Sequence, residues 1–247
     1  MLHKLRYLLL QVRDPDDPMR EHEVGCFVRV LGCPRSHVGV FDLLGGWPKP
    51  RDLARYDVVL LGGSGDYSVA EGGAWLEPSL EAMHELYVIN KPTFASCWGF
   101  QAMTRALGGE VVTDVDRAEV GTHELFLTDA GRRDPVFGPL AEAGPTFCAQ
   151  LGHKDIVVRL PGAAELLVSS RRVENQAFRF PGKHIYCTQF HPELNRRTLL
   201  DRLRKYPSYV EQIAGMPYEQ FTRAHCHESP HTEDLLLRFV KQVAGIR

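Results

Sequence analysis

Short apolar runs alternate with longer mixed segments over the first hundred residues. Runs with the length of buried strands lie at 5–12, 38–43, 57–61 and 92–96. The segments between them predict helices at 19–31 and 74–88, and turn residues such as those at 14–18 separate the elements. Because strands and helices alternate in this way, the sequence predicts an α/β fold with a mostly parallel, doubly wound sheet and helices on both faces.

The pattern changes after the glycine pair at 108–109. Shorter runs of β type, punctuated by Gly and Pro, lie at 119–128, 146–150, 164–169, 175–180 and 184–190. They predict a partly antiparallel extension of the sheet. Residues 196–245 have a mostly helical pattern broken by prolines. We therefore expect one large domain over 1–195, with a helical extension at 196–247 packed on it.

One cysteine stands between the apolar run at 92–96 and the helical pattern that follows it. A strand that turns sharply into a helix pushes the side chain at the turn into a strained, exposed position, and the helix N-terminus favours thiolate over thiol. Cys97 is therefore the candidate nucleophile, although a lone cysteine is more often a buried structural thiol. Gly99 leaves room for close helix packing, and the backbone N–H of Trp98 would face an oxyanion at such a turn.

A histidine and a glutamate supply the partners that such a cysteine needs. His191 and Glu193 are two residues apart, so an extended backbone points both side chains to the same face, and Pro192 biases His191 toward that conformation. A carboxylate beside the imidazole fixes its tautomer and stabilises the imidazolium. Cys97, His191 and Glu193 therefore form a candidate catalytic triad. The alternatives are a satisfied core histidine and a solvated strand-end carboxylate.

A glycine cluster, Gly62-Gly63-Ser64-Gly65, follows the third strand. Glycines alone are weak evidence beyond turn formation. No Lys-Ser or Lys-Thr follows at P-loop spacing and no G-x-G-x-x-G is present, which argues against phosphate binding. Its place beside the expected cysteine turn predicts the second half of an oxyanion hole, with the backbone N–H of Gly63 as the donor.

These segments together resemble the class I glutamine amidotransferases, both the triad glutaminase domain of GMP synthetase and the stand-alone γ-glutamyl peptidases. The likeness extends over about residues 55–195 in ordered blocks: Gly62-Gly63-Ser64-Gly65, Cys97 to Gln101, Ala118-Glu119-Val120-Gly121, His153-Lys154-Asp155 and His191-Pro192-Glu193. Departures from the family's usual residues bear on fine geometry and substrate choice but remove no catalytic atom; they are Ser64, Ala95, Ser96 and Lys154.

The resemblance implies a flavodoxin-like sheet and hydrolysis of a γ-glutamyl amide through a thioester, without a metal or organic cofactor. It also implies that Glu119, Val120 and Gly121 lie on the substrate side of the site. Gln101, one helical turn beyond Cys97, either lines the pocket for the glutamyl group or is an exposed helical residue. His153, Lys154 and Asp155 are expected at the rim of the cleft, with no role assigned to them.

Composition narrows the possible partners and location. Lys plus Arg is 29 against Asp plus Glu 31, a formal charge of −2 that gives no electrostatic reason to expect nucleic acid. The sequence contains no membrane span or secretory signal, so we expect a cytoplasmic protein with reduced thiols at its six scattered cysteines. A cluster at 225–227, His-Cys-His, has ligand types that metals favour, but its spacing matches no zinc pattern well.

Three functions stay open on these observations. The first is free-standing hydrolysis of glutamine, a γ-glutamyl peptide or a conjugate. A second is supply of ammonia to a separate synthetase partner, because no ATP-binding module remains once the glutaminase-like region is assigned. The third is a catalytically silent interaction protein on the same fold. The helical segment at 196–245 is consistent with a wall that closes the cleft, and equally with a docking surface.

Overall fold

The computed structural model describes residues 4–245 and contains a nine-stranded sheet in the order β2-β1-β3-β4-β11-β10-β9-β6-β7. Five neighbouring strands in this order run parallel, and they are β2 (Val38–Asp42), β1 (Tyr7–Gln11), β3 (Val58–Leu61), β4 (Thr93–Ser96) and β11 (Ile185–Thr188). The parallel sheet predicted from the alternating pattern is confirmed for β1 to β4, each within a few residues of its expected place. The fifth parallel strand, β11, had been expected in the partly antiparallel extension.

The remaining four strands of the sheet are antiparallel: β10 (Ala177–Arg179), β9 (Glu165–Ser169), β6 (Glu119–Leu127) and β7 (Phe147–His153). They confirm the expected antiparallel extension. A separate ribbon of β5 (Glu110–Thr113) and β8 (Asp155–Arg159) was not predicted. Both strands expose residues along part of their length, so they lack the continuous apolar run that marks the parallel strands.

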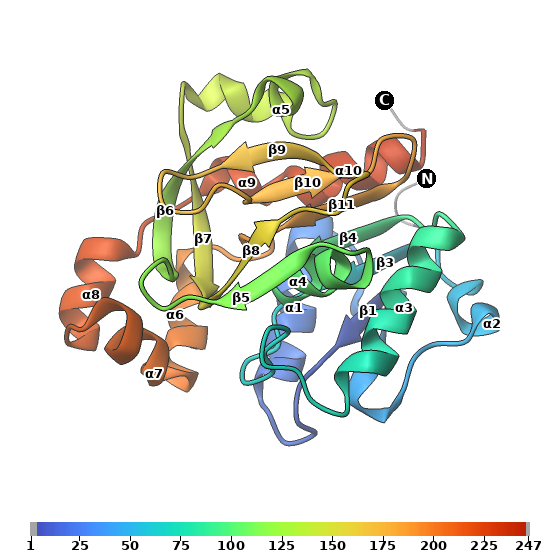
Figure 1. Ribbon diagram of the computed structural model, residues 1–247, viewed down its shortest axis with the longest axis horizontal. Coiled ribbons are helices and arrows are strands. Elements are labelled where there is room, and N and C mark those ends of the chain that lie inside the picture. Colours follow the sequence, from blue (N-terminus) through green and yellow to red (C-terminus); the bar gives the residue numbers. More distant parts are fainter. Residues whose placement is uncertain (1–3, 246–247) are drawn as a thin grey trace.

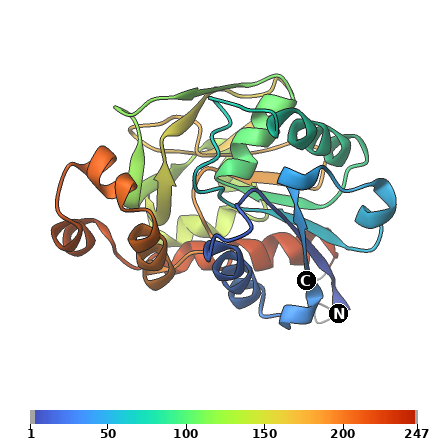
Figure 2. The ribbon, with the colours of Figure 1, turned by 90° about the horizontal axis from the view of Figure 1, so that it is seen from below.

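Helices cover both faces of the parallel strands (Figures 1 and 2). Successive side chains of a strand point to opposite faces. On β1, Tyr7 and Leu9 join one core cluster with α1 (Met19–Leu31) and α10 (Leu235–Val243). Leu8 and Leu10 join a second cluster with α3 (Leu76–Val88) and α4 (Trp98–Ala106). The apolar runs of β1, β3, β4 and β11 are continuous because these strands are buried throughout, whereas the edge strand β2 is partly exposed.

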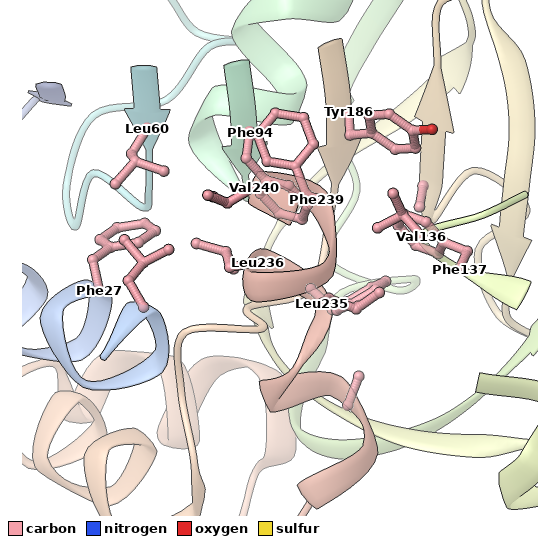
Figure 3. Close-up of a cluster of buried hydrophobic side chains, with 14 of the residues drawn as sticks. Phe27, Leu60, Phe94, Val136, Phe137, Tyr186, Leu235, Leu236, Phe239 and Val240 are labelled. Carbon is pink, nitrogen blue, oxygen red and sulfur yellow. The ribbon is translucent and has the colours of Figure 1, made fainter. Parts of the chain in front are cut away.

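The helical pattern after residue 195 corresponds to two different structures. Helix α10 packs its apolar side against the sheet, where Phe239 lies 5.4 Å from Phe94 and 5.6 Å from Tyr186 between ring centroids (Figure 3). Helix α9 (Pro230–Glu233) precedes α10 and also packs behind the sheet, against β7. The others stand beside the sheet (Figure 1), and they are α6 (Arg196–Lys205), α7 (Pro207–Tyr209), a π-helical turn (Val210–Ala214) and α8 (Tyr218–His225).

Two short helices complete the described elements, α2 (Pro50–Leu53) and α5 (Asp129–Arg133), along with 3₁₀ turns at 35–37, 43–45 and 138–143. Between residues 4 and 245, none of the helices is both long and apolar enough to cross a membrane.

Candidate active site

Three adjacent parallel strands bring the predicted site residues to one edge of the sheet. Strand β4 lies between β3 and β11, with Leu61 opposite Ala95 and Ser96 opposite Thr188. The glycine turn follows β3, Cys97 follows β4, and His191 comes shortly after β11. Because the carboxyl ends of parallel strands meet at the same edge, the three segments converge there, as ligand sites in such sheets generally do.

Cys97 lies at a strained turn between β4 and α4. Its φ of 50° is in the left-handed region that a non-glycine residue rarely adopts. Its backbone N–H donates to the carbonyl of Thr188 at 2.7 Å, which ties the turn to β11. A Cβ on Gly99 would lie 2.5 Å from Leu61 Cβ, so only glycine allows α4 to approach β3 this closely. The turn predicted from the sequence is thus held by contacts on both sides.

His191 and Glu193 form a buried pair beside this turn. His191 Nδ1 and Glu193 Oε1 are 2.6 Å apart, with the histidine 4% exposed and the glutamate fully buried. Ser96 Oγ donates to the other carboxylate oxygen at 3.2 Å, and Arg29 donates to the backbone carbonyl of Glu193 at 2.9 Å. With Nδ1 directed at the carboxylate, the Nε2 atom remains for Cys97. The structure therefore brings the three predicted triad residues together.

The charges of this cluster favour an imidazolium. Burial by itself would lower the pKa of His191, but Glu193 and Cys97 outweigh it and raise this pKa to about 9. Burial would likewise raise the pKa of Glu193, but the charge and hydrogen bond of His191, together with Arg202, hold it below its usual value. At neutral pH the histidine carries a proton and the glutamate is ionised, which suits a base that later acts as an acid.

A second buried charge cluster lies against the triad, and the sequence analysis did not identify it. Glu23 on α1 is fully buried, and its carboxylate meets Arg13 Nη2 at 3.3 Å and Arg202 Nη2 at 3.6 Å. Gln11 also donates to it, at 2.9 Å. The spacing of residues in α1 could have indicated that Glu23 is buried. Glu23 lies four residues from both Met19 and Phe27, on the buried side of its helix.

The backbone N–H of Gly63, predicted as an oxyanion donor, has another partner in this structure. It donates to Glu23 Oε1 at 3.1 Å. A buried N–H that is bonded to a carboxylate is unavailable to an oxyanion unless that bond breaks. In residues 4–245, by contrast, no acceptor is found for the backbone N–H groups of Trp98 and Ser64. The expectation for Gly63 therefore requires correction for this conformation, because Glu23 was not foreseen.

The triad opens into a pocket with two unlike walls. One wall combines the glycine turn, Trp98, Gln101 and the segment Gly152–Asp155. Gln101 is buried, and its Nε2 donates to Asp155 O at 2.9 Å, so it is not an exposed helical residue. The other wall comes from α6 to the π-helical turn and includes Leu199, Arg202, Leu203, Tyr206, Tyr209, Gln212 and Ile213.

Glu119, Val120 and Gly121 are absent from the described lining of this pocket. Glu119 is buried in a network and accepts bonds from Gln176 at 2.6 Å and His153 at 3.1 Å. Val120 packs in the cluster formed by the helices after residue 195, and Gly121 faces the backbone of His225. The structure thus places these three expected substrate residues behind the cleft, where they support His153 and α8.

The cluster at 225–227 does not assemble into a metal site. Within residues 4–245, no group of three or more His, Cys, Asp or Glu side chains is arranged to hold a metal ion. Helix α8 ends at His225, and the buried Cys226 follows in an extended conformation.

Comparisons with known proteins identify relatives of this chain. Residues 34–203 match the family described as glutamine amidotransferase class-I. The chain is 29% identical to γ-glutamyl peptidase 4 of Arabidopsis thaliana over 210 residues, covering 81% of this chain and 80% of the relative. It is 33% identical to the glutamine-hydrolyzing GMP synthase of Gloeobacter violaceus over 180 residues, 72% of this chain but 30% of that protein.

A solved glutamine amidotransferase from Thermotoga maritima shares the fold. It superposes with a TM-score of 0.73, covers 98% of both chains and is 21% identical in sequence. The matched family segment spans more than half of the sequence and includes Cys97 and the His191–Glu193 pair. The chain therefore belongs to the class-I glutamine amidotransferase family.

Proposed function

We propose that this protein hydrolyses γ-glutamyl amide bonds through a thioester on Cys97. The observation that carries the proposal is the buried 2.6 Å contact between His191 and Glu193, next to a cysteine at a strained turn that lines the pocket. This is the arrangement of nucleophile, base and orienting carboxylate that acyl transfer requires. The pKa of about 9 for His191 further favours a protonated imidazole that can serve as the acid for the leaving group.

In the first half-reaction the sulfur of Cys97 attacks the γ-carbonyl carbon, and the carbonyl π electrons move to its oxygen. When the tetrahedral intermediate collapses, the C–N bond breaks and His191 gives its proton to the departing amine or ammonia. Water then attacks the thioester while His191 accepts one of its protons. Expulsion of the sulfur releases glutamate and restores the starting charges.

The developing oxyanion needs N–H donors, and two backbone amides are available in this conformation. Those of Trp98 and Ser64 line the pocket region and have no acceptor among the described residues. Gly63 can serve only after it leaves Glu23. One oxyanion donor is worth about 3 kcal/mol of transition-state stabilisation, so the choice of donor affects rate strongly.

For the leaving group, we propose an amino acid, peptide or conjugate, released without a partner protein. The similarity to γ-glutamyl peptidase 4 extends over 80% of that protein, which supports a peptidase-like substrate. The second wall of the pocket, from α6 to the π-helical turn, gives a larger leaving group a surface to contact. The second candidate is a glutaminase that works with a synthetase, since the chain is also similar to one subunit of the glutamine-hydrolyzing GMP synthase of Methanothermobacter thermautotrophicus.

Product analysis with purified protein tests both candidates. The panel comprises glutamine, γ-glutamyl dipeptides and glutathione conjugates, with Cys97→Ala protein as the blank. We expect release of glutamate from the larger substrates, with a higher kcat/KM than for glutamine. Activity on glutamine alone that rises strongly when a synthetase is added would favour the second candidate. No hydrolysis of any member, and no Cys97 labelling by a γ-glutamyl electrophile, would refute the enzyme proposal.

A further inference from the structure

Arg202 lies between the triad and the buried charge cluster. It is 8% exposed, and α6 brings it to the pocket from a point eleven residues beyond His191. Its Nη2 atom is 3.6 Å from Glu193 Oε1 and also 3.6 Å from Glu23 Oε1. One guanidinium therefore faces the orienting carboxylate of the triad and the carboxylate that holds the Gly63 amide.

The surrounding charges show why this guanidinium matters to Glu193. Besides the His191–Cys97 pair, the buried cluster holds the carboxylates Glu23 and Glu193 and the cations Arg13 and Arg202. Arg13 already contacts Glu23 with two nitrogens, Nε at 3.4 Å and Nη2 at 3.3 Å. Removing Arg202 would leave two buried carboxylates with one arginine, and that arginine is committed to Glu23. Glu193 would then keep His191 as its cationic partner, with the hydroxyl of Ser96 as a neutral donor.

Arg202 interacts with its neighbours mainly through charge, because few of its nitrogen atoms have a hydrogen-bond acceptor. Its Nε and Nη2 atoms are buried and make no hydrogen bond within the described residues. Nη1 approaches His191 Nδ1 at 3.4 Å, but Nδ1 is already directed at Glu193 and a guanidinium has no acceptor atom. A buried guanidinium left with ionic contacts alone is costly unless its electrostatic role repays that cost.

We propose that Arg202 is a positioning residue, which keeps Glu193 ionised and directed at His191 and so makes the triad depend on helix α6. This inference rests on the proposed hydrolysis, because it assigns Arg202 a part in that same site. Arg202 touches no reacting atom in this scheme. It acts through Glu193, and through Glu23 it also bears on the glycine turn.

The groups that face Glu193 decide how pH enters the test. His191 and Arg202 face it directly, and Cys26 and Arg29 of α1 lie beside it. Cys97 faces His191, and His22, Glu23 and Arg13 surround Arg202. Loss of a cation at about 4 Å raises the pKa of a carboxylate, commonly by about 1 unit or more. Glu193 would then take up a proton at a higher pH.

The experiment compares Arg202→Gln and Arg202→Lys with wild type, and Arg204→Gln is the matched control. Arg204 is on the same helix but exposed, and it pairs with Asp201 at 3.0 Å. We expect Arg202→Gln to lower kcat by about tenfold or more with little change in KM, and to move the acid limb of the kcat profile up by about 1 pH unit. Arg202→Lys should recover part of both, and Arg204→Gln should match wild type.

The rate of Cys97 alkylation by iodoacetamide, followed against pH, provides a readout that needs no γ-glutamyl substrate. If Arg202→Gln is folded and its kcat, acid limb and alkylation profile all match wild type, the inference is wrong. The inference also fails if Arg202→Lys loses as much activity as Arg202→Gln with an unchanged acid limb. A wild-type protein that hydrolyses no substrate refutes the proposed function. In that case an alkylation profile shifted by Arg202→Gln would still support the role of Arg202 in positioning.

Discussion

The parallel and antiparallel halves of the sheet use buried carboxylates in opposite ways. In the parallel half, Glu193 is paired with a histidine that lines the pocket at a strand end beside Cys97. In the antiparallel half, Glu119 is equally buried and is also paired with a histidine, His153, at 3.1 Å. However, Glu119 is further enclosed by Gln176 and Ser170. A buried Glu–His pair is therefore no catalytic signature until a nucleophile stands beside it.

Cysteine replacements should show the largest difference in turnover between the parallel and antiparallel halves of the sheet. Cys97→Ala should reduce hydrolysis to background, a loss of about 10⁴-fold or more, because no other group can form the thioester. Cys148→Ala, on β7 of the antiparallel half, should keep wild-type turnover. Steady-state kinetics with circular dichroism as a folding check measures both. Near-normal turnover by Cys97→Ala would remove the distinction altogether.

Replacement of the orienting carboxylate, Glu193, should have the second largest effect on kcat. Glu193→Gln should lower kcat by about a hundredfold, because a neutral amide stabilises the imidazolium less well, and His191→Ala should be nearly inactive. The comparison is with wild type under saturating γ-glutamyl substrate. Wild-type kcat in Glu193→Gln, combined with an inactive His191→Ala, would show that another group orients the histidine.

The pH dependence should show the influence of Glu193 on His191. With a pKa raised to about 9, His191 stays protonated through neutral pH and loses its proton as the pH rises through about 9. The acid that protonates the leaving amine is then lost, so kcat should fall by about tenfold per pH unit above that value. In Glu193→Gln this limb should move to lower pH. A wild-type limb near the ordinary imidazole value would contradict the pairing.

The smallest effect on turnover is expected in the antiparallel half. Glu119→Gln removes the charge that His153 and Gln176 share, so it should lower the free energy of unfolding by about 1–3 kcal/mol. Its kcat should stay within a few-fold of wild type, because its partner His153 transfers no proton in the proposed reaction. Urea unfolding and kinetics on one preparation separate the two quantities. A loss of kcat as large as that of Glu193→Gln would mean that the halves do not differ.

The parallel half could be predicted from sequence because most of its strands, β1, β3, β4 and β11, are buried throughout and give continuous apolar runs. The turn at Cys97 could also be predicted from sequence, since the strand, Cys97 and Gly99 follow one another closely in the chain. The ribbon β5–β8 was missed because its strands are partly exposed. His191 and Glu193 could be paired because they lie only two residues apart in the chain. The extended backbone expected between them is wrong, however: residues 192–193 form a turn, in which the backbone N–H of Leu194 donates to the carbonyl of His191 at 3.2 Å.

Long-range charge contacts could not be predicted in this way. Glu23 reaches Gly63 across forty residues, and Arg202 reaches Glu23 from a third segment. Charged residues in a helical pattern ordinarily face solvent, so each was unremarkable alone. Their spacing contained a partial signal: Arg202 lies among Leu199, Leu203 and Tyr206, which also line the pocket. The spacing shows which side of helix α6 is buried, but it does not show which charged residue of another segment lies against Arg202.

The packing of α10 has a consequence for the order in which the protein is made. Phe239 and Val240 complete a core that also contains Phe27, more than two hundred residues earlier in the chain (Figure 3). During synthesis, the first strands and α1 leave the ribosome long before α10 exists. The part of this face that α1 does not cover therefore stays exposed until residues 235–240 emerge, and such distant contacts close slowly. A nascent chain stalled before α10 should bind chaperones through this face.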